Sequence, residues 1–309
     1  MSVQDTTAVL RWTCCLCTVG QVLHTLPEGE VVAGVTSLDN EIFVLRNKER
    51  DQVEVYDVIT YRLQRCLTVP NSRSFTDVTS CEHYHCLYIG DTIRYDTIVE
   101  FNVDSKADQF VESVHRLEVR GASTRWPVND VPFGLSVTAA HNVIVTCPVV
   151  RKIKEFSSHG DILRELTLPD DVIHPLHTIQ LRSGQFIVSH GDVDNPINRV
   201  CMISADGRHI VHSHGGHWGS ATGQYNVPRH LAVDYSEFVY VVDMNNRRVT
   251  LLSPTLWYIR HIRQVVSSDK LTGRPTRLYL DVQRRRLYVA DSEWKDNKFI
   301  AGRVVVFSV

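Results

Sequence analysis

The sequence predicts an all-β fold of six repeated units, each made of four short antiparallel strands. The first support is a phrase that occurs twice: residues 228–234 return, 47 positions later, as residues 275–281. The second is that each copy leads into another apolar run, which ends in Asp243 or in Asp291. A repeat of this length made of short strands is typical of radial β-architectures.

The repeat extends back through most of the chain with decreasing similarity. Each unit has an apolar or proline-led strand followed, after a short turn, by a second apolar strand. The units begin near residues 32, 75, 132, 175, 228 and 275. Successive starts are 43 to 57 residues apart, which is room for four strands per unit.

The fifth unit shows the four strands most clearly. We expect them at residues 231–233, 238–242, 248–252 and 258–262, with turns rich in Asn, Asp, Ser and Pro between them. Strands of about five residues joined by such turns fit the four-stranded blades of a β-propeller. We find no amphipathic helical pattern, so the predicted fold is a six-bladed β-propeller.

The sixth unit ends after its third strand, at residues 303–307, and the missing strand is expected at the other end of the chain. Residues 20–27 resemble residues 160–169, the fourth strand of the third unit. We therefore expect residues 1–27 to complete the last blade and close the ring. Closure would remove two exposed sheet edges that otherwise favour aggregation. Residues 1–309 are then one domain.

Composition narrows the functional classes. The net charge of -2 disfavours a strongly basic nucleic-acid-binding domain, and no apolar run approaches the length of a membrane span. The eight cysteines are scattered, mostly inside predicted strands, without the paired spacing of a zinc site. We therefore expect a cytoplasmic protein with reduced thiols, no cofactor and no membrane association. The sequence does not indicate an oligomeric state.

One stretch resembles a known family. Glycine-containing residues 215–227 lead into the Pro228 strand, and Asp243 is followed by Asn246, Arg248 and Val249. This order resembles an NHL repeat. The match is strongest in the fifth unit, weaker in the sixth, where a longer loop follows Asp291, and weakest elsewhere.

The resemblance implies a propeller similar to the C-terminal domain of TRIM-type NHL proteins, which bind proteins or RNA. In those proteins, RING, B-box and coiled-coil regions carry out ubiquitin transfer and oligomerisation. The 309 residues contain neither a Cys/His zinc framework nor a heptad run. The resemblance therefore does not imply ligase activity for this chain.

The Asp-led motif has a structural interpretation. Asp243 ends one strand and Arg248 begins the next, so their side chains can pair across the turn. Asn246 is suited to the left-handed conformation that tight turns require. We expect Asp243, Asn246, Arg248 and Asp291 to be structural.

Propeller geometry places the inter-blade loops and the second-to-third-strand turns on one face, where binding is expected. Aromatic and arginine side chains on exposed loops are typical interface anchors. Acidic residues are interspersed among them, which favours a protein or peptide partner and leaves RNA as the alternative. The candidate binding residues are Arg94, Tyr95, Trp126, Arg151, Lys152, Arg199, Trp218, Tyr225 and Trp294.

Fifteen histidines raise a second alternative, a metal-dependent propeller lyase or lactonase. His174, His177 and His190 share the fourth unit with a dense group at residues 209–217, and His230 follows Pro228. Catalytic zinc needs three convergent protein ligands and one open position. Spacing does not assign three of these histidines to one place, so we predict neither a metal site nor catalytic residues and favour a non-enzymatic scaffold.

Overall fold

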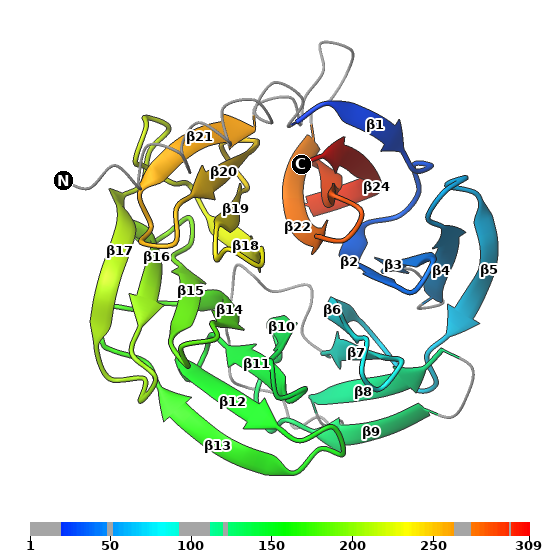
Figure 1. Ribbon diagram of the computed structural model, residues 1–309, viewed down its shortest axis with the longest axis horizontal. Coiled ribbons are helices and arrows are strands. Elements are labelled where there is room, and N and C mark those ends of the chain that lie inside the picture. Colours follow the sequence, from blue (N-terminus) through cyan, green and yellow to red (C-terminus); the bar gives the residue numbers. More distant parts are fainter. Residues whose placement is uncertain (1–19, 48–51, 93–111, 120–122, 263–272, 297) are drawn as a thin grey trace, which may run out of the picture.

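The computed structural model describes residues 20–47, 52–92, 112–119, 123–262, 273–296 and 298–309. These residues form six four-stranded antiparallel sheets arranged as blades around a central axis (Figure 1). The six-bladed β-propeller is thus confirmed. Within the described ranges there is no helix, and hence none long and apolar enough to cross a membrane.

Each blade is named by its order in the chain and described from its inner to its outer strand. The first three blades are β2 (Val32–Leu38), β3 (Glu41–Arg46), β4 (Gln52–Asp57), β5 (Leu63–Thr68); β6 (Phe75–Cys81), β7 (Cys86–Asp91), β8 (Ser113–Glu118), β9 (Ser123–Pro127); and β10 (Gly134–Val137), β11 (Val143–Cys147), β12 (Lys152–Phe156), β13 (Ile162–Thr167). The other three are β14 (Pro175–Gln180), β15 (Phe186–His190), β16 (Ile197–Ile203), β17 (Ile210–His217); β18 (Pro228–Val233), β19 (Val239–Asp243), β20 (Arg248–Leu252), β21 (Tyr258–Ile262); and β22 (Gly273–Asp281), β23 (Arg286–Lys295), β24 (Lys298–Ser308), β1 (Val22–Thr25).

The ring closes as expected, because β1 pairs antiparallel with β24 and becomes the outer strand of the sixth blade (Figure 1). Arg46 then fastens this junction to the first blade. Its guanidinium donates to the carbonyl oxygens of Pro27 at 2.9 Å and Gly302 at 2.7 Å, and it pairs with Glu54 at 2.9 Å. The first blade therefore departs from the Asp-led pattern at a residue that serves closure.

Apolar side chains fill the spaces between neighbouring blades. Each of the six hydrophobic clusters of the described residues lies mainly between two adjacent blades. Between the third and fourth blades, for example, Ile144 and Ile153 pack with Phe186 and Val188. Because both faces of most blades are covered, the middle strands are apolar on both sides, as β7, β11 and β19 show.

The inner strands share a local irregularity. The antiparallel register shifts at the start of β2, β6, β14 and β18 and two residues into β22. Such a bulge adds one residue to the strand and redirects the next side chain. In each of these five strands, the residue that follows the bulge lies two positions after the start of the sequence unit.

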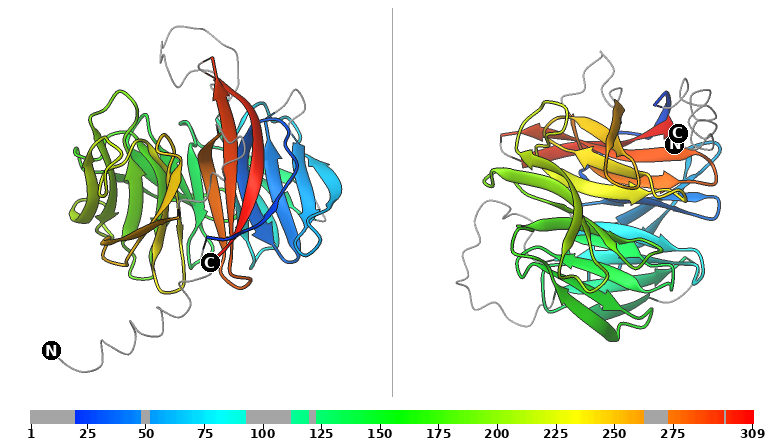
Figure 2. Two further views of the ribbon diagram at one scale, coloured as in Figure 1. Left: turned by 90° about the horizontal axis from the view of Figure 1, so that it is seen from above. Right: turned by 60° about the vertical axis from the view of Figure 1, so that its left-hand side comes forward.

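The propeller has two different faces. The loop-rich face carries the inter-blade loops and the turns between second and third strands, and the turn face carries the remaining short connections. Seen from the side, the long β23–β24 hairpin extends beyond the other blades (Figure 2).

Candidate functional site

The positions after the inner-strand bulges meet in the central channel. They are Gly34, Asp77, His177, His230 and Arg277, and Gly134 holds the corresponding position in the third blade. The two glycines let inner strands approach closely: a Cβ on Gly34 would lie 2.9 Å from the Val78 nitrogen, and one on Gly134 would lie 2.5 Å from the Leu176 oxygen. The four larger side chains share the remaining space, and we call Asp77, His177, His230 and Arg277 the channel cluster.

Asp77 is the centre of the channel cluster. Its Oδ2 accepts a hydrogen bond from the Leu135 backbone at 2.9 Å and one from His230 Nε2 at 3.2 Å, across the channel. Its Oδ1 lies 3.3 Å from Arg277 Nε, and Arg277 also donates to the Thr76 carbonyl oxygen at 2.5 Å. Burial alone would raise the pKa of Asp77, but the interaction with His230, including its hydrogen bond, and the charge of Arg277 lower it to about 2.

The two histidines are held as neutral rings with defined tautomers. His177 Nε2 lies 3.0 Å from the Leu135 carbonyl oxygen, and His230 Nε2 faces the Asp77 carboxylate. Since these oxygens only accept hydrogen bonds, both Nε2 atoms must donate. Burial lowers the pKa of both imidazoles below the ordinary value, so the cluster holds one negative charge and one positive charge at neutral pH.

The channel cluster has distances that a metal ion could use but not the surroundings of a metal centre. Asp77, His177 and His230 each offer a ligand atom, and these atoms lie within 4.8 Å of one another. However, Arg277 already neutralises the carboxylate. Metal-bound histidines normally donate their second N–H to a partner, whereas Nδ1 of His177 and of His230 has none. The channel cluster therefore fits a charge-balanced network of ion pairs and hydrogen bonds between blades better than it fits a metal site.

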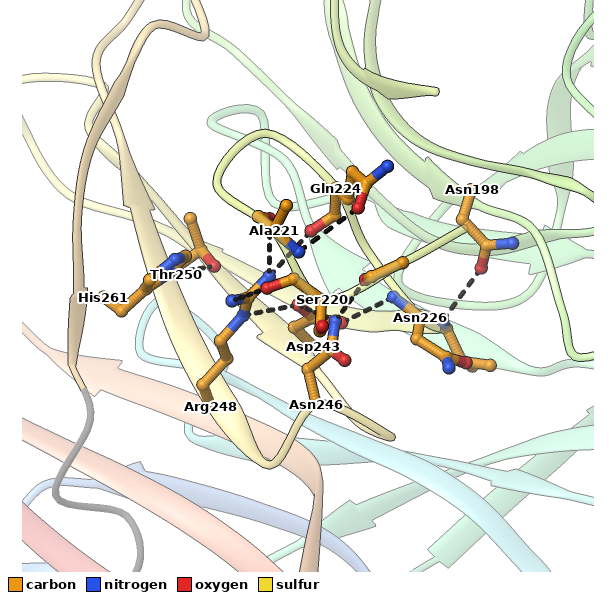
Figure 3. Close-up of polar contacts among 12 residues, drawn as sticks. Asn198, Ser220, Ala221, Gln224, Asn226, Asp243, Asn246, Arg248, Thr250 and His261 are labelled. Carbon is orange, nitrogen blue, oxygen red and sulfur yellow. Dashed lines mark hydrogen bonds and ion pairs between the residues drawn. The ribbon is translucent and has the colours of Figure 1, made fainter. Parts of the chain in front are cut away.

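The Asp-led motif of the fifth blade does more than close its own turn. Arg248 Nε pairs with Asp243 Oδ2 at 2.7 Å, and its Nη atoms reach the carbonyl oxygens of Ser220 at 2.9 Å and Gln224 at 2.7 Å (Figure 3). Asp243 Oδ1 also accepts the Asn226 backbone N–H at 2.8 Å. We call the Asp243–Arg248 ion pair and its hydrogen bonds the clasp. The clasp thus anchors the whole loop of residues 218–227.

The turn conformation within the clasp differs from the expectation. Asn246 is not the left-handed residue, because positive φ falls on Arg247 at 52°. Asn246 instead donates to Asp243 Oδ2 and to the Gly219 oxygen, both at 2.8 Å. Asp291 has the corresponding place in the sixth blade and pairs with Arg303 at 3.3 Å.

Exposed apolar side chains collect on four connected loops of the loop-rich face. We call this the apolar patch; its members are Val149, Val150, Ile173, Val193 and Trp218. Val193 and Trp218 are 61% and 59% exposed. Hydrogen bonds join the loops: Gly191 N to Ile173 O at 3.1 Å, Trp218 N to Pro196 O at 2.8 Å, and Arg151 to Asp170 at 3.0 Å.

Two residues predicted to bind a partner are buried, which corrects their assignment. Trp126 is 6% exposed and packs with Tyr88 and Phe156 against the backbone of Gly160. Tyr225 is 1% exposed beneath the clasped loop. Both act as packing residues and offer no surface to a partner.

The other predicted binding residues have varied environments. Trp218 is exposed, whereas Trp294 is half-buried between Phe299 and the Arg274 guanidinium, 4.9 Å from its ring. Arg151 and Lys152 pair with Asp170 and Glu165, and Arg199 is half-buried opposite His190. Arg94 and Tyr95 lie outside the described residues.

Comparisons with known proteins support the fold alone. No protein-family model and no curated protein matches the chain, so the NHL resemblance is not confirmed. Similar solved structures include Kuenenia stuttgartiensis hydrazine synthase (TM-score 0.59, 13% identity, 94% of this chain and 98% of that one) and the Cps50 (Swd1) β-propeller domain of Myceliophteria thermophila (0.57, 11%, 93% and 99%). Another is virginiamycin B lyase from Staphylococcus aureus (0.56, 10%, 92% and 99%).

Asp77→Asn should destabilise the propeller strongly. Removing one partner of a buried ion pair leaves the other charge uncompensated, which costs about 3 to 5 kcal/mol. Guanidinium-induced unfolding measures the loss. Glu41→Gln, which breaks a partly exposed pair with Arg65, is the control and should cost about 1 kcal/mol or less. Equal effects of the two substitutions would contradict a major contribution of the channel cluster to stability.

Stability should fall on mild acidification. Burial lowers the pKa of His177 and His230, and that of His190 to about 4. As the pH falls, these rings therefore bind protons at a higher pH in the unfolded chain than in the folded protein, which favours unfolding. Between pH 7.5 and pH 6, a ring that stays neutral in the folded state costs up to about 1 kcal/mol of stability. Burial raises the pKa of Asp243 to about 6, which opposes part of this loss. The net decrease should be on the order of 1 to 2 kcal/mol.

Denaturant unfolding at the two pH values measures this decrease. His190→Gln should reduce the difference measurably, because one of the imidazoles with a lowered pKa is then absent. Unfolding free energies that stay constant or increase on acidification would show that the buried rings do not control the pH response.

Proposed function

We propose that this propeller is a non-enzymatic recognition scaffold that binds a protein or peptide through its loop-rich face. The observation that carries the proposal is the apolar patch of Ile173, Val193, Trp218 and their neighbours, displayed on hydrogen-bonded loops. Exposed apolar groups gathered on one face are typical of interaction sites. The Asp243–Arg248 clasp supports this role because it fixes the loop that presents Trp218.

Charge around the apolar patch favours a protein over RNA. Asp170, Asp171 and Asp194 are exposed on the same loops, and Arg151 and Lys152 are already paired with carboxylates. Binding of a nucleic acid needs a positive field that neutralises phosphates. A partner with apolar side chains flanked by Lys or Arg is complementary to this surface.

The double substitution Trp218→Ala and Val193→Asp should weaken partner binding without loss of stability, because both side chains are exposed. Cross-linking capture with wild-type and variant protein identifies partners that only the wild type retains. Isothermal titration of a purified partner should then show at least about a tenfold loss of affinity, which is a loss of about 1.4 kcal/mol in binding free energy.

Trp257→Ala on the turn face is the matched control and should bind like the wild type, since Trp257 is also exposed. Trp294→Ala tests whether the interface reaches the sixth blade. Retention of single-stranded RNA that weakens steeply with salt, with no protein bound, would favour the RNA alternative.

A metal-dependent enzyme is the second candidate, favoured by the spacing of Asp77, His177 and His230. We expect only substoichiometric metal in protein purified without a histidine tag, because Arg277 already compensates the carboxylate. Elemental analysis measures this. One zinc or calcium ion per chain, lost in His177→Ala, would overturn the scaffold proposal and assign the channel cluster to metal chemistry.

A further inference from the structure

We propose that the turn face carries a second binding site, a groove that receives an acidic peptide with an aliphatic side chain. The groove lies between the sixth and first blades and has a volume of about 440 Å³. Leu23 of β1 and the β4–β5 turn form its apolar walls, and two arginines complete it. Its lining residues are Leu23, Val58, Ile59, Tyr61, Arg284 and Arg286.

The apolar wall is rigid although it is exposed. Ile59 is 78% exposed at the tip of a turn whose backbone Asp57 fixes: Asp57 Oδ1 accepts the N–H groups of Ile59 at 3.0 Å and Thr60 at 2.6 Å. Tyr61 has φ of 56° and stacks on His24 of β1 with 4.5 Å between ring centroids. A preorganised surface loses little conformational entropy when a ligand binds.

The two arginines of the groove have different roles. Arg284 is held by Asp281 at 3.0 Å and by Asn40 at 2.8 Å, so it is part of the wall. Arg286 Nη1 donates only to the carbonyl oxygens of Arg284 and Arg285, and it has no carboxylate partner within the described ranges. Its positive charge therefore remains uncompensated beside the apolar wall.

An uncompensated guanidinium next to aliphatic side chains defines the chemistry of the occupant. The guanidinium can bind a carboxylate in a charge-assisted, bidentate manner, while Leu23 and Ile59 cover an aliphatic side chain. Asp57 does not pair with Arg286, because its Oδ1 accepts the turn's own N–H groups and its Oδ2 accepts a hydrogen bond from Gln64. A partner segment with Leu or Ile adjacent to Asp or Glu satisfies both halves of the groove.

A fluorescent probe peptide with the sequence Asp-Glu-Leu-Leu-Glu-Asp, titrated into the full chain, tests the proposal by polarisation. We expect saturable binding that weakens at least about tenfold when Lys replaces the acids or Ser replaces the leucines of the probe. Ile59→Asp and Arg286→Glu should each cause a similar loss. Trp257→Ala, on the same face but outside the groove, should leave the affinity unchanged.

Charge reversal gives the sharpest readout. Arg286→Glu should bind the Lys-containing probe better than the wild type does, which a merely misfolded variant could not do. Absence of saturable binding by the acidic probe, or binding insensitive to Ile59→Asp and Arg286→Glu, would overturn the proposal. So would displacement of the probe by a synthetic peptide of residues 1–19, or an Ile59-dependent dimer, because the groove would then serve the chain itself.

The groove and the apolar patch are tested separately. The Trp218→Ala and Val193→Asp double variant should bind the acidic probe normally, because its substitutions lie on the opposite face. Loss of the loop-face partner in that variant, with probe binding intact, would place two independent sites on one propeller.

Discussion

The buried carboxylate of Asp77 is the constraint on which the centre of this propeller depends. Hydrogen bonds and ion pairs from the third, fifth and sixth blades converge on its two oxygens. The Asp77–His230 contact joins residues 153 positions apart, and the Arg277–Thr76 bond joins residues 201 positions apart. Because a buried charge is stable only when paired and hydrogen-bonded, these contacts favour simultaneous assembly of the blades around one residue.

The sequence repeat made the fold predictable, and the residues of the channel cluster occupy the same position in different units of that repeat. Asp77, His177, His230 and Arg277 each lie two residues after the start of a unit, as do Gly34 and Gly134. Sequence reasoning noted His177 and His230 but not their common register with Asp77 and Arg277. The sequence pattern alone did not reveal the bulges near the start of the inner strands. These bulges direct the side chain at this position of the unit toward the central channel.

Burial of individual aromatic residues could not be predicted in the same way. Trp126 and Trp218 both occur near blade junctions, yet Trp126 packs against the backbone of Gly160 and Trp218 faces solvent. The difference depends on a glycine in a neighbouring blade, 34 positions from Trp126, and not on the local pattern around either tryptophan. Loop conformation likewise placed positive φ on Arg247 instead of Asn246.

The two proposed sites differ in local charge, and this bears on what each can bind. Around the apolar patch, exposed Asp170, Asp171 and Asp194 surround aliphatic and aromatic side chains. In the groove of the turn face, an uncompensated Arg286 lies beside Leu23 and Ile59. Charge complementarity selects partners by penalising like-charged ones. A segment that suits one proposed site is therefore disfavoured by the charge at the other, so the two proposed sites would select different partners.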